Sequence, residues 1–371
     1  MGLNDLLYIV SAFLSAILIS YISMPVIIKV AELKKLIDAP DGDRKIHDKT
    51  VPNLGGIGIF SAFIISISIW GKTAEMVSFP FLIASLFMLF LIGIKDDILA
   101  LSPFKKLAVQ ITAAFLLVVG GGVVLTDFGG LFYLDQVPWI AGVGISVFIL
   151  VAIVNSYNLI DGIDGLAGGI GIIVSAVLGI WFWAAGFLSL AVLSFALSGS
   201  LISFLMFNMY PAKIFMGDTG AMAVGFIIGF LAIEFISLNA SIAGEGWHIA
   251  NGQVFAIAIL IVPIVDTLRV FTLRLARGKH PFTADRNHTH HKLLEIGMQH
   301  HLASFSLWLA NIIVIGFGFM INHLQINLQL FLVMLLGLLI LPSIGFIYQF
   351  SIKFIENRRS KRETEALYDT H

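Results

Sequence analysis

The chain has 371 residues, of which 58% are hydrophobic and only 12% charged, and its formal net charge is −1. This composition, with a mean hydropathy of +0.97, excludes an ordinary soluble globular protein and predicts a polytopic membrane protein. No cysteine is present, which excludes disulfides and thiolate metal sites. The first apolar run lacks a basic n-region and a small-residue cleavage site, so we expect a retained helix rather than a signal peptide.

Apolar runs long enough to cross a hydrocarbon layer of about 30 Å recur along the chain. We predict about eleven transmembrane helices from these runs, near 6–31, 54–71, 77–94, 107–126, 138–156, 166–184, 187–206, 220–239, 251–269, 303–322 and 326–350. No repeat or low-complexity linker interrupts them. The expected fold is therefore all-α, with one transmembrane catalytic domain over residues 1–350 and a basic cytoplasmic tail over 351–371.

Basic residues are distributed very unevenly among the loops. When the loops are numbered alternately from the N-terminus, only Lys72 of the 22 Lys and Arg residues lies in the set that holds loops 72–76 and 240–250. By the positive-inside rule, the other set faces the cytoplasm. We therefore expect the N-terminus outside, the C-terminus inside, and the unusual polar segments at the cytoplasmic face.

The segment 155–169 places two amides, Asn155 and Asn158, and two carboxylates, Asp161 and Asp164, between long apolar runs. Acids next to membrane helices are costly, about 2.5–3.5 kcal/mol each at a helix centre. Their i, i+3 spacing would put both on one face of a helix start, which suits a metal or a polar substrate. The alternative is a helix N-terminus capped by acids.

Two further acidic segments are expected at the same face. Asp96 and Asp97 end an apolar run and are followed by Lys106, whose ammonium suits a phosphate; ordinary solvated acids are the alternative. Asp218 lies in a Gly-Asp-Thr-Gly turn before a helix, where an N-cap is the alternative. These acids outnumber the lysines that could pair with them, which favours binding of a divalent metal. Mg²⁺ suits such a site because it prefers oxygen ligands.

Two loops carry the basic and histidine residues. Lys49 belongs to a basic first loop that suits phosphates, although the loop taken alone fits an ordinary positive-inside loop better. The longest inner loop contains Arg286 and a His-x-His-His group, which suit an anionic sugar nucleotide. The group would also suit zinc, but no nearby Cys completes such a site. Its members are His288, His290 and His291.

Five motifs in this order resemble the polyprenyl-phosphate N-acetylhexosamine-1-phosphate transferases, to which phospho-N-acetylmuramoyl-pentapeptide transferase is related. They are Arg-Lys-x-His with Pro-x-x-Gly-Gly, Asp-Asp with Leu-Ser-Pro-x-x-Lys-Leu, Asn-x-x-Asn-x-x-Asp-Gly-x-Asp-Gly-Leu-Ala, Phe-Met-Gly-Asp-Thr-Gly and Asp-Arg-x-His-x-His-His. They cover roughly residues 20–300. The last motif is similar to the bacterial branch that uses UDP-N-acetylglucosamine.

The resemblance implies a multi-pass enzyme of the bacterial inner membrane that starts lipid-linked cell-envelope glycan synthesis. Undecaprenyl phosphate would attack the sugar-linked phosphorus of a UDP-N-acetylhexosamine and release UMP, by single or double displacement. Mg²⁺, or Mn²⁺ in its place, would be held by Asp218 with Asp97 or Asp161. The bilayer is an implied partner, a homodimer stays open, and no nucleic-acid partner is expected.

The resemblance also implies residue roles. Asp96 or Asp97 would deprotonate or orient the lipid phosphate, and Lys106 would bind a phosphate. The implied catalytic acids are Asp96, Asp97, Asp161 and Asp164. Among the implied substrate-binding residues, Lys49 and Lys106 would bind phosphates, and Asn155 and Asn158 would line the nucleotide side. The last loop would bind the sugar and diphosphate through Arg286, His288, His290 and His291.

Two other function classes share some of these features. A secondary transporter can carry intramembrane acids and glycine-interrupted helices, but its acids should lie deep and be reachable from both faces. Another magnesium-dependent membrane prenyltransferase or phosphotransferase would need a second Asp-x-x-x-Asp cluster or an Asp-Gly-x-x-Ala-Arg run. Asp164-Gly-Leu-Ala continues with Gly168 instead of Arg.

Overall fold

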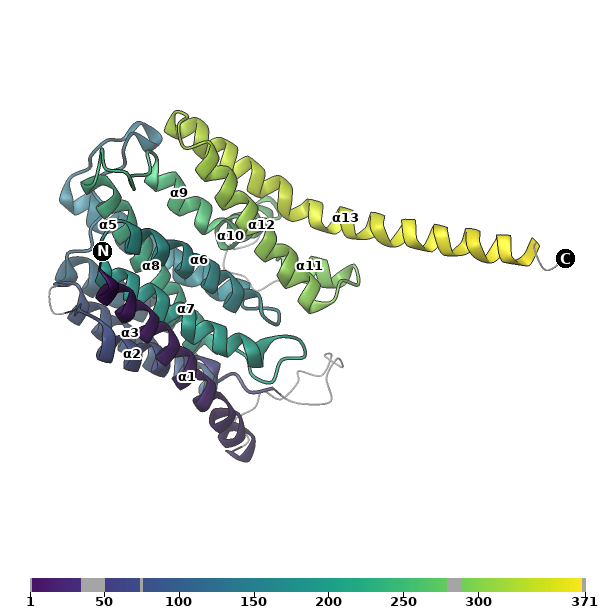
Figure 1. Ribbon diagram of the computed structural model, residues 1–371, viewed down its shortest axis with the longest axis horizontal. Helices are drawn as coiled ribbons and strands as arrows, with labels where there is room; N and C mark the ends of the chain where they lie inside the picture. The colour runs from purple at the N-terminus through teal and green to yellow at the C-terminus, as the bar shows by residue number, and fades with distance from the viewer. Residues whose placement is uncertain (1, 35–50, 74–75, 279–287, 369–371) are drawn as a thin grey trace.

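The computed structural model describes residues 2–34, 51–73, 76–278 and 288–368, with side chains described as far as residue 353. It is a bundle of α-helices, from which the last helix projects to carry the C-terminus (Figure 1). Within the described ranges there is no β-strand, and Asp127 and Gln136 form an isolated bridge. The predicted all-α class is confirmed. The elements are α1 (Leu3–Lys34), α2 (Gly55–Trp70), α3 (Phe79–Leu99), α4 (Pro103–Phe115), η2 (Leu116–Gly120), η3 (Leu131–Tyr133), α5 (Trp139–Ile160), α6 (Leu166–Ala184), α7 (Leu188–Asn208), α8 (Gly217–Ser241), α9 (Gly252–Ile259), α10 (Ile261–Ala276), α11 (Thr289–Glu295), α12 (His300–Met320) and α13 (Ile326–Tyr368).

The helices support a multi-pass membrane protein. In the part of the chain that the structure describes, eight helical segments are long and apolar enough to span a membrane, and the bent pair α9 and α10 would make a ninth. α2, with only 16 residues, and α3 are not among them. The count of eleven, the orientation of the termini and the division at residue 350 stay predictions. α13 continues through that division without a break.

α8 is the central helix of the bundle. Most of its residues are buried, and it packs against α2, α3, α5 and α6. Small residues let the neighbours approach its first turn: a Cβ on Gly56 of α2 would lie 2.1 Å from the Gly220 nitrogen, and one on Gly93 of α3 would lie 2.5 Å from the Thr219 Cα. Such contacts are typical of membrane helices, whose association depends on close packing.

The predicted run 251–269 forms two helices instead of one. α9 and α10 meet at Leu260 with a bend of 77°. Pro263, which has no backbone N–H, lies just after the break. Asn311 of α12 compensates for the broken ladder, since its amide donates to the Ile259 carbonyl at 3.1 Å and its oxygen accepts from the Val262 N–H at 3.4 Å. Freed backbone groups at membrane depth need such partners.

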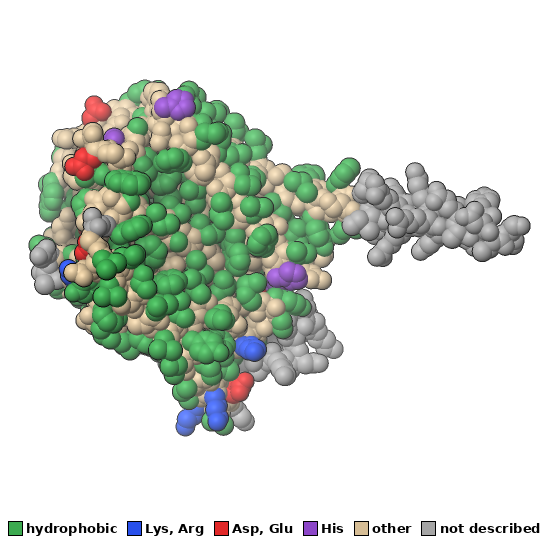
Figure 2. Space-filling view, viewed as in Figure 1, with side chains coloured by type: hydrophobic (Ala, Val, Ile, Leu, Met, Phe, Trp, Pro, Cys, Tyr) green, Lys and Arg blue, Asp and Glu red, His purple; other side chains and the backbone are tan. Residues whose placement is uncertain are grey.

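The exposed surface is also that of a membrane protein. In the view of Figure 2, hydrophobic side chains cover the middle of the bundle, and charged side chains appear mostly near its edges. The candidate acids also lie at helix ends. Asp96 and Asp97 lie in the last turn of α3, Asp161 follows the end of α5, and Asp218 lies in the first turn of α8. The site therefore forms where two helices end and another begins.

Candidate active site

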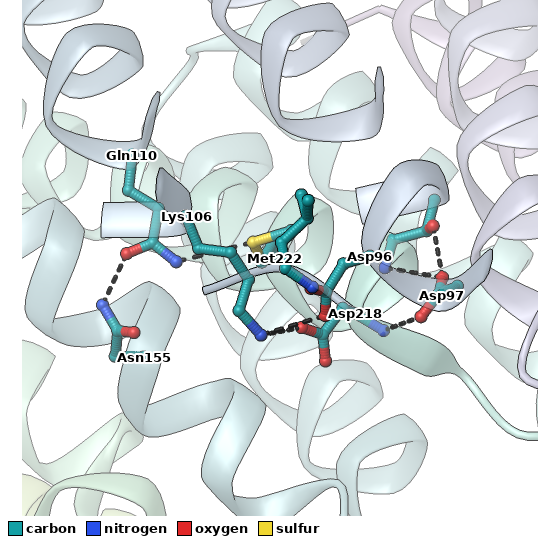
Figure 3. A network of polar contacts seen from close by, with 9 residues as sticks. Asp96, Asp97, Lys106, Gln110, Asn155, Asp218 and Met222 are labelled. Atoms are coloured by element: carbon teal, nitrogen blue, oxygen red, sulfur yellow. Dashed lines mark hydrogen bonds and ion pairs between the residues drawn. The ribbon is translucent and has the colours of Figure 1, made fainter. Parts of the chain in front are cut away.

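A lysine joins two of the predicted acids. Lys106 of α4 places its Nζ 2.9 Å from Asp96 Oδ2 and 2.6 Å from Asp218 Oδ2, and all three side chains are partly buried (Figure 3). The other oxygen of Asp96 accepts a hydrogen bond from the Leu101 N–H at 2.6 Å. This backbone bond orients Asp96 toward Lys106. Asp96 and Lys106 thus form one charged cluster with Asp218, which lies more than a hundred positions away in the chain.

Asp97 contacts the beginning of α8. Its Oδ1 accepts the Asp218 N–H at 2.7 Å, and its Oδ2 accepts the Thr219 N–H at 3.1 Å and the Thr219 hydroxyl. A helix N-terminus has unpaired N–H groups and a partial positive charge, so a carboxylate there is stabilising. Asp97 therefore supplies the cap that sequence analysis considered for Asp218. Its metal role stays a prediction.

The Pro-x-x-Gly-Gly motif holds the turn before α8. Gly55 and Gly56 donate backbone hydrogen bonds to the Phe215 and Met216 carbonyls at 2.9 and 2.8 Å. Gly217 has φ +70°, and a Cβ there would lie 2.1 Å from the Asn53 carbonyl and 2.8 Å from Asp97. Only glycine suits this position. The turn that presents Asp218 is thus fixed by residues from α2 and α3.

Asp161 and Asp164 do not share a helix face, which corrects the expectation from their spacing. Both precede α6, whose N-cap Gly165 has φ +82°. Asp161 accepts a backbone hydrogen bond from Gly217. Asp164 is buried; it accepts the Ala212 N–H at 3.1 Å and lies 3.5 Å from His300 Nδ1. The two carboxylates therefore point to different segments.

The environment of Asp161 is strongly negative. Burial and the nearby charges of Asp218, Asp97 and Asp164 raise the pKa of Asp161 well above its ordinary value. A divalent cation would relieve this repulsion, and carboxylate oxygens suit Mg²⁺. However, no group of three metal-ligating side chains lies close together within the described ranges. Asp218 there already pairs with the Lys106 ammonium. Mg²⁺ stays a prediction that the chemistry of the acids supports.

The two predicted amides differ in their contacts. Asn155 Nδ2 donates to Gln110 Oε1 of α4 at 2.7 Å and to the Val151 carbonyl at 2.7 Å (Figure 3). Gln110 in turn points to Met222 of α8, with its Nε2 3.5 Å from the sulfur. The Asn158 carbonyl accepts the Asp161 N–H at 3.3 Å at the end of α5. Gln110 was not found from the sequence, because a single Gln in a helix gives no motif.

The described histidines of the last motif lie beside the loop of residues 161–165, which joins α5 to α6 and carries Asp161 and Asp164. His288 and His290 are buried, and the ring centroids of His290 and His291 are 4.3 Å apart. A Cβ on Gly162 would lie 2.2 Å from His290 Nε2, so the ring packs directly on this glycine. The structure therefore brings His290 to the segment that carries Asp161 and Asp164, and its role toward the sugar and diphosphate stays a prediction. Lys49 and Arg286 lie outside the described residues.

Comparisons with known proteins agree with the geometry. Residues 79–236 match Glycosyl transferase family 4. The chain is 31% identical over 332 residues to the probable undecaprenyl-phosphate N-acetylglucosaminyl 1-phosphate transferase of Bacillus subtilis, covering 88% of this chain and 89% of the relative. The chain belongs to Glycosyl transferase family 4.

Other relatives of the chain have names of the same kind. Decaprenyl-phosphate N-acetylglucosaminephosphotransferase of Mycolicibacterium smegmatis is 33% identical over 74% of this chain and 73% of the relative. Undecaprenyl-phosphate alpha-N-acetylglucosaminyl 1-phosphate transferase of Escherichia coli O157:H7 is 28% identical over 80% of this chain and 79% of the relative. The resemblance found from the five motifs is confirmed.

Proposed function

We propose that this family 4 protein transfers N-acetylglucosamine 1-phosphate from UDP-N-acetylglucosamine to undecaprenyl phosphate at the cytoplasmic face of a bacterial inner membrane. The observation that carries the proposal is the Lys106 ammonium between Asp96 and Asp218, at a level where membrane helices begin and end. A site at one end of the bundle suits a lipid phosphate and a water-soluble nucleotide. A transporter would instead require acids at the midplane.

In this reaction an oxygen of the lipid phosphate forms a bond to the sugar-linked phosphorus, and the bond from that phosphorus to the bridging oxygen of the diphosphate breaks. UMP leaves with the electron pair. Aligning the two anions and neutralising the developing charge are the main demands on the protein. Lys106 suits the second demand, because an incoming phosphate can replace one of its two carboxylate partners.

The acids divide between orientation and charge. Asp96 is oriented by the Leu101 N–H, which makes it our candidate to orient or deprotonate the lipid phosphate. Asp161 and Asp218 would hold Mg²⁺, which supplies further charge neutralisation when bound. A double displacement is the alternative: an Asp oxygen would first bond to the sugar-linked phosphorus and displace UMP, and the lipid phosphate would then bond to that phosphorus and displace the Asp. His290, whose pKa is lowered to about 3 by burial and by the charge of His291, would contact the donor as a neutral ring.

The direct test is transfer by the purified protein in detergent. Radiolabelled UDP-N-acetylglucosamine, undecaprenyl phosphate and Mg²⁺ should give label in the organic phase and free UMP, and EDTA should abolish both. Transfer from UDP-N-acetylgalactosamine alone would keep the reaction and correct the sugar. A folded protein that transfers from no UDP-sugar would overturn the proposal.

A further inference from the structure

Asp266 is a buried carboxylate that no motif singled out as a site residue. It lies on α10, in the second half of the bent helix pair, and only 2% of its surface is exposed. Its Oδ2 lies 2.7 Å from Nδ1 of His288, which is 4% exposed, and its Oδ1 accepts the Thr289 N–H at 2.7 Å. Burying a carboxylate is costly unless hydrogen bonds compensate it, and both of its oxygens are paired here.

The pairing fixes the proton of the His288 ring. An ionised carboxylate only accepts hydrogen bonds, so His288 Nδ1 must carry the hydrogen that it donates to Asp266. In the neutral ring, Nε2 is then left as an acceptor, and in the protonated ring it becomes a second donor. Asp266 thereby determines which chemistry His288 can offer to a substrate.

His288 is linked through His290 to the loop of residues 161–165, which carries Asp161 and Asp164. The His288 and His290 rings are stacked, with centroids 5.6 Å apart and planes 15° from parallel. His290 packs on Gly162, which lies between the two acids of that loop. Arg269, one helical turn after Asp266, donates to the Thr289 hydroxyl at 3.4 Å. One face of α10 thus sets the beginning of α11 and, through it, the histidines beside the site.

We propose that Asp266 is a positioning residue that holds His288 in the Nδ1–H form, which leaves Nε2 to bind the diphosphate-sugar donor. This inference rests on the proposed function. It assigns a role to the face of α10 that carries Asp266 and Arg269, which contacts the histidine segment. A carboxylate that merely anchored α11 would not act through the His288 ring.

The test is a double-mutant cycle on kcat/KM with the full-length protein. Asp266→Asn keeps the shape but can donate to Nδ1, which would place the ring hydrogen on Nε2. His288→Asn keeps a donor near Asp266 and removes Nε2. We expect Asp266→Asn to lower kcat/KM on the order of a hundredfold in the wild-type background, by analogy with other Asp–His pairs. The same change should cost less than about threefold in the His288→Asn background.

Two controls separate the outcomes. Asp266→Glu keeps the acceptor and should retain more activity than Asp266→Asn at a similar melting temperature, which provides a second comparison if the Asn variant folds poorly. Equal losses in both His288 backgrounds, or no rescue by Glu at matched stability, would overturn the positioning role alone. No transfer by the wild-type protein with any UDP-sugar would overturn the proposed function, and this proposal with it.

Discussion

Adjacent acids in the last turn of α3 have different partners, although the sequence treats them alike. Asp96 pairs with Lys106, whereas Asp97 accepts two backbone N–H groups and a hydroxyl at the start of α8. The sequence predicts that Asp97→Asn and Asp218→Asn both fold normally. The structure changes this expectation for Asp97, because an amide has only one oxygen to replace two acceptors.

We therefore expect Asp97→Asn to lower the free energy of unfolding by about 1–3 kcal/mol as well as to lose turnover. Asp218→Asn should lose turnover with little change in stability, because Lys106 keeps Asp96 as an ion-pair partner and the amide removes a negative charge that repels Asp161. Thermal melting in detergent and the transfer assay separate the two effects. Equal melting temperatures for the two variants would contradict the capping role of Asp97.

The raised pKa of Asp161 predicts how Mg²⁺ binding depends on pH. Because burial and neighbouring acids raise its pKa above the ordinary value of 3.8, the folded protein binds this proton more tightly than the unfolded chain. The associated stability is present at low pH and is lost as pH rises through the raised pKa. A metal ligand must be deprotonated, so Mg²⁺ competes with the proton.

The expected result is a Mg²⁺-induced rise in melting temperature that grows as pH increases above the ordinary aspartate pKa and through the raised pKa of Asp161, because the competing proton is then removed. Melting curves with and without MgCl₂ measure it. Asp161→Asn is the matched control and should flatten the dependence. A rise that is the same at every pH in the wild-type protein would exclude Asp161 from the metal site.

At the scale of elements, glycines decide how closely α2 and α3 approach α8. Gly56→Ala and Gly93→Ala would place a Cβ 2.1 and 2.5 Å from the α8 backbone, which must then shift. We expect each to lower the free energy of unfolding by about 1–3 kcal/mol. Activity should fall further, because the displaced segment carries Asp218. Thermal melting and transfer assays on the same preparations measure both effects.

Gly144 of α5 is the matched control, since a Cβ there meets no atom within 4 Å. Gly144→Ala should be neutral or stabilise by about 0.5–1 kcal/mol, because alanine favours a helix. If Gly56→Ala and Gly93→Ala behaved like Gly144→Ala, the close packing on α8 would not determine the geometry of the site.

The helices could be predicted from the sequence better than their breaks and contacts. Long apolar runs are sufficient to predict α5 to α8, because the bilayer requires such lengths. The break at Leu260 was missed, because its backbone groups are satisfied by Asn311, which lies far along the chain. The Asp266–His288 pair was missed because the two residues are 22 positions apart, one in α10 and the other just before α11, so that no sequence spacing fixes their contact.

At the scale of the whole molecule, the uneven distribution of Lys and Arg predicts that all the acidic motifs lie at one face. In the structure Asp96, Asp161 and Asp218 all lie at helix ends, Lys106 joins Asp96 to Asp218, and Asp218 lies near Asp161. The pairings within the cluster were not predictable, because the sequence does not fix which of several nearby acids Lys106 contacts. Sidedness itself stays a prediction.

The absence of cysteine from the natural chain makes sidedness directly measurable. α8 has 25 residues, about 37 Å at 1.5 Å per residue, which exceeds the hydrocarbon thickness. Lys105, in the helix that carries Lys106, and Glu245, beyond the far end of α8, should therefore lie on opposite sides of the membrane. Both residues are exposed, so single cysteines at these positions are accessible to a reagent.

A membrane-impermeant maleimide should label Glu245→Cys in intact cells and Lys105→Cys only after permeabilisation, because the positive-inside rule places the basic side in the cytoplasm. The cysteine-free parent measures background labelling. The reverse pattern would put the charged cluster outside, away from cytoplasmic sugar nucleotides, and would contradict the proposed donor. Labelling of both positions in intact cells would mean that α8 does not separate the two faces.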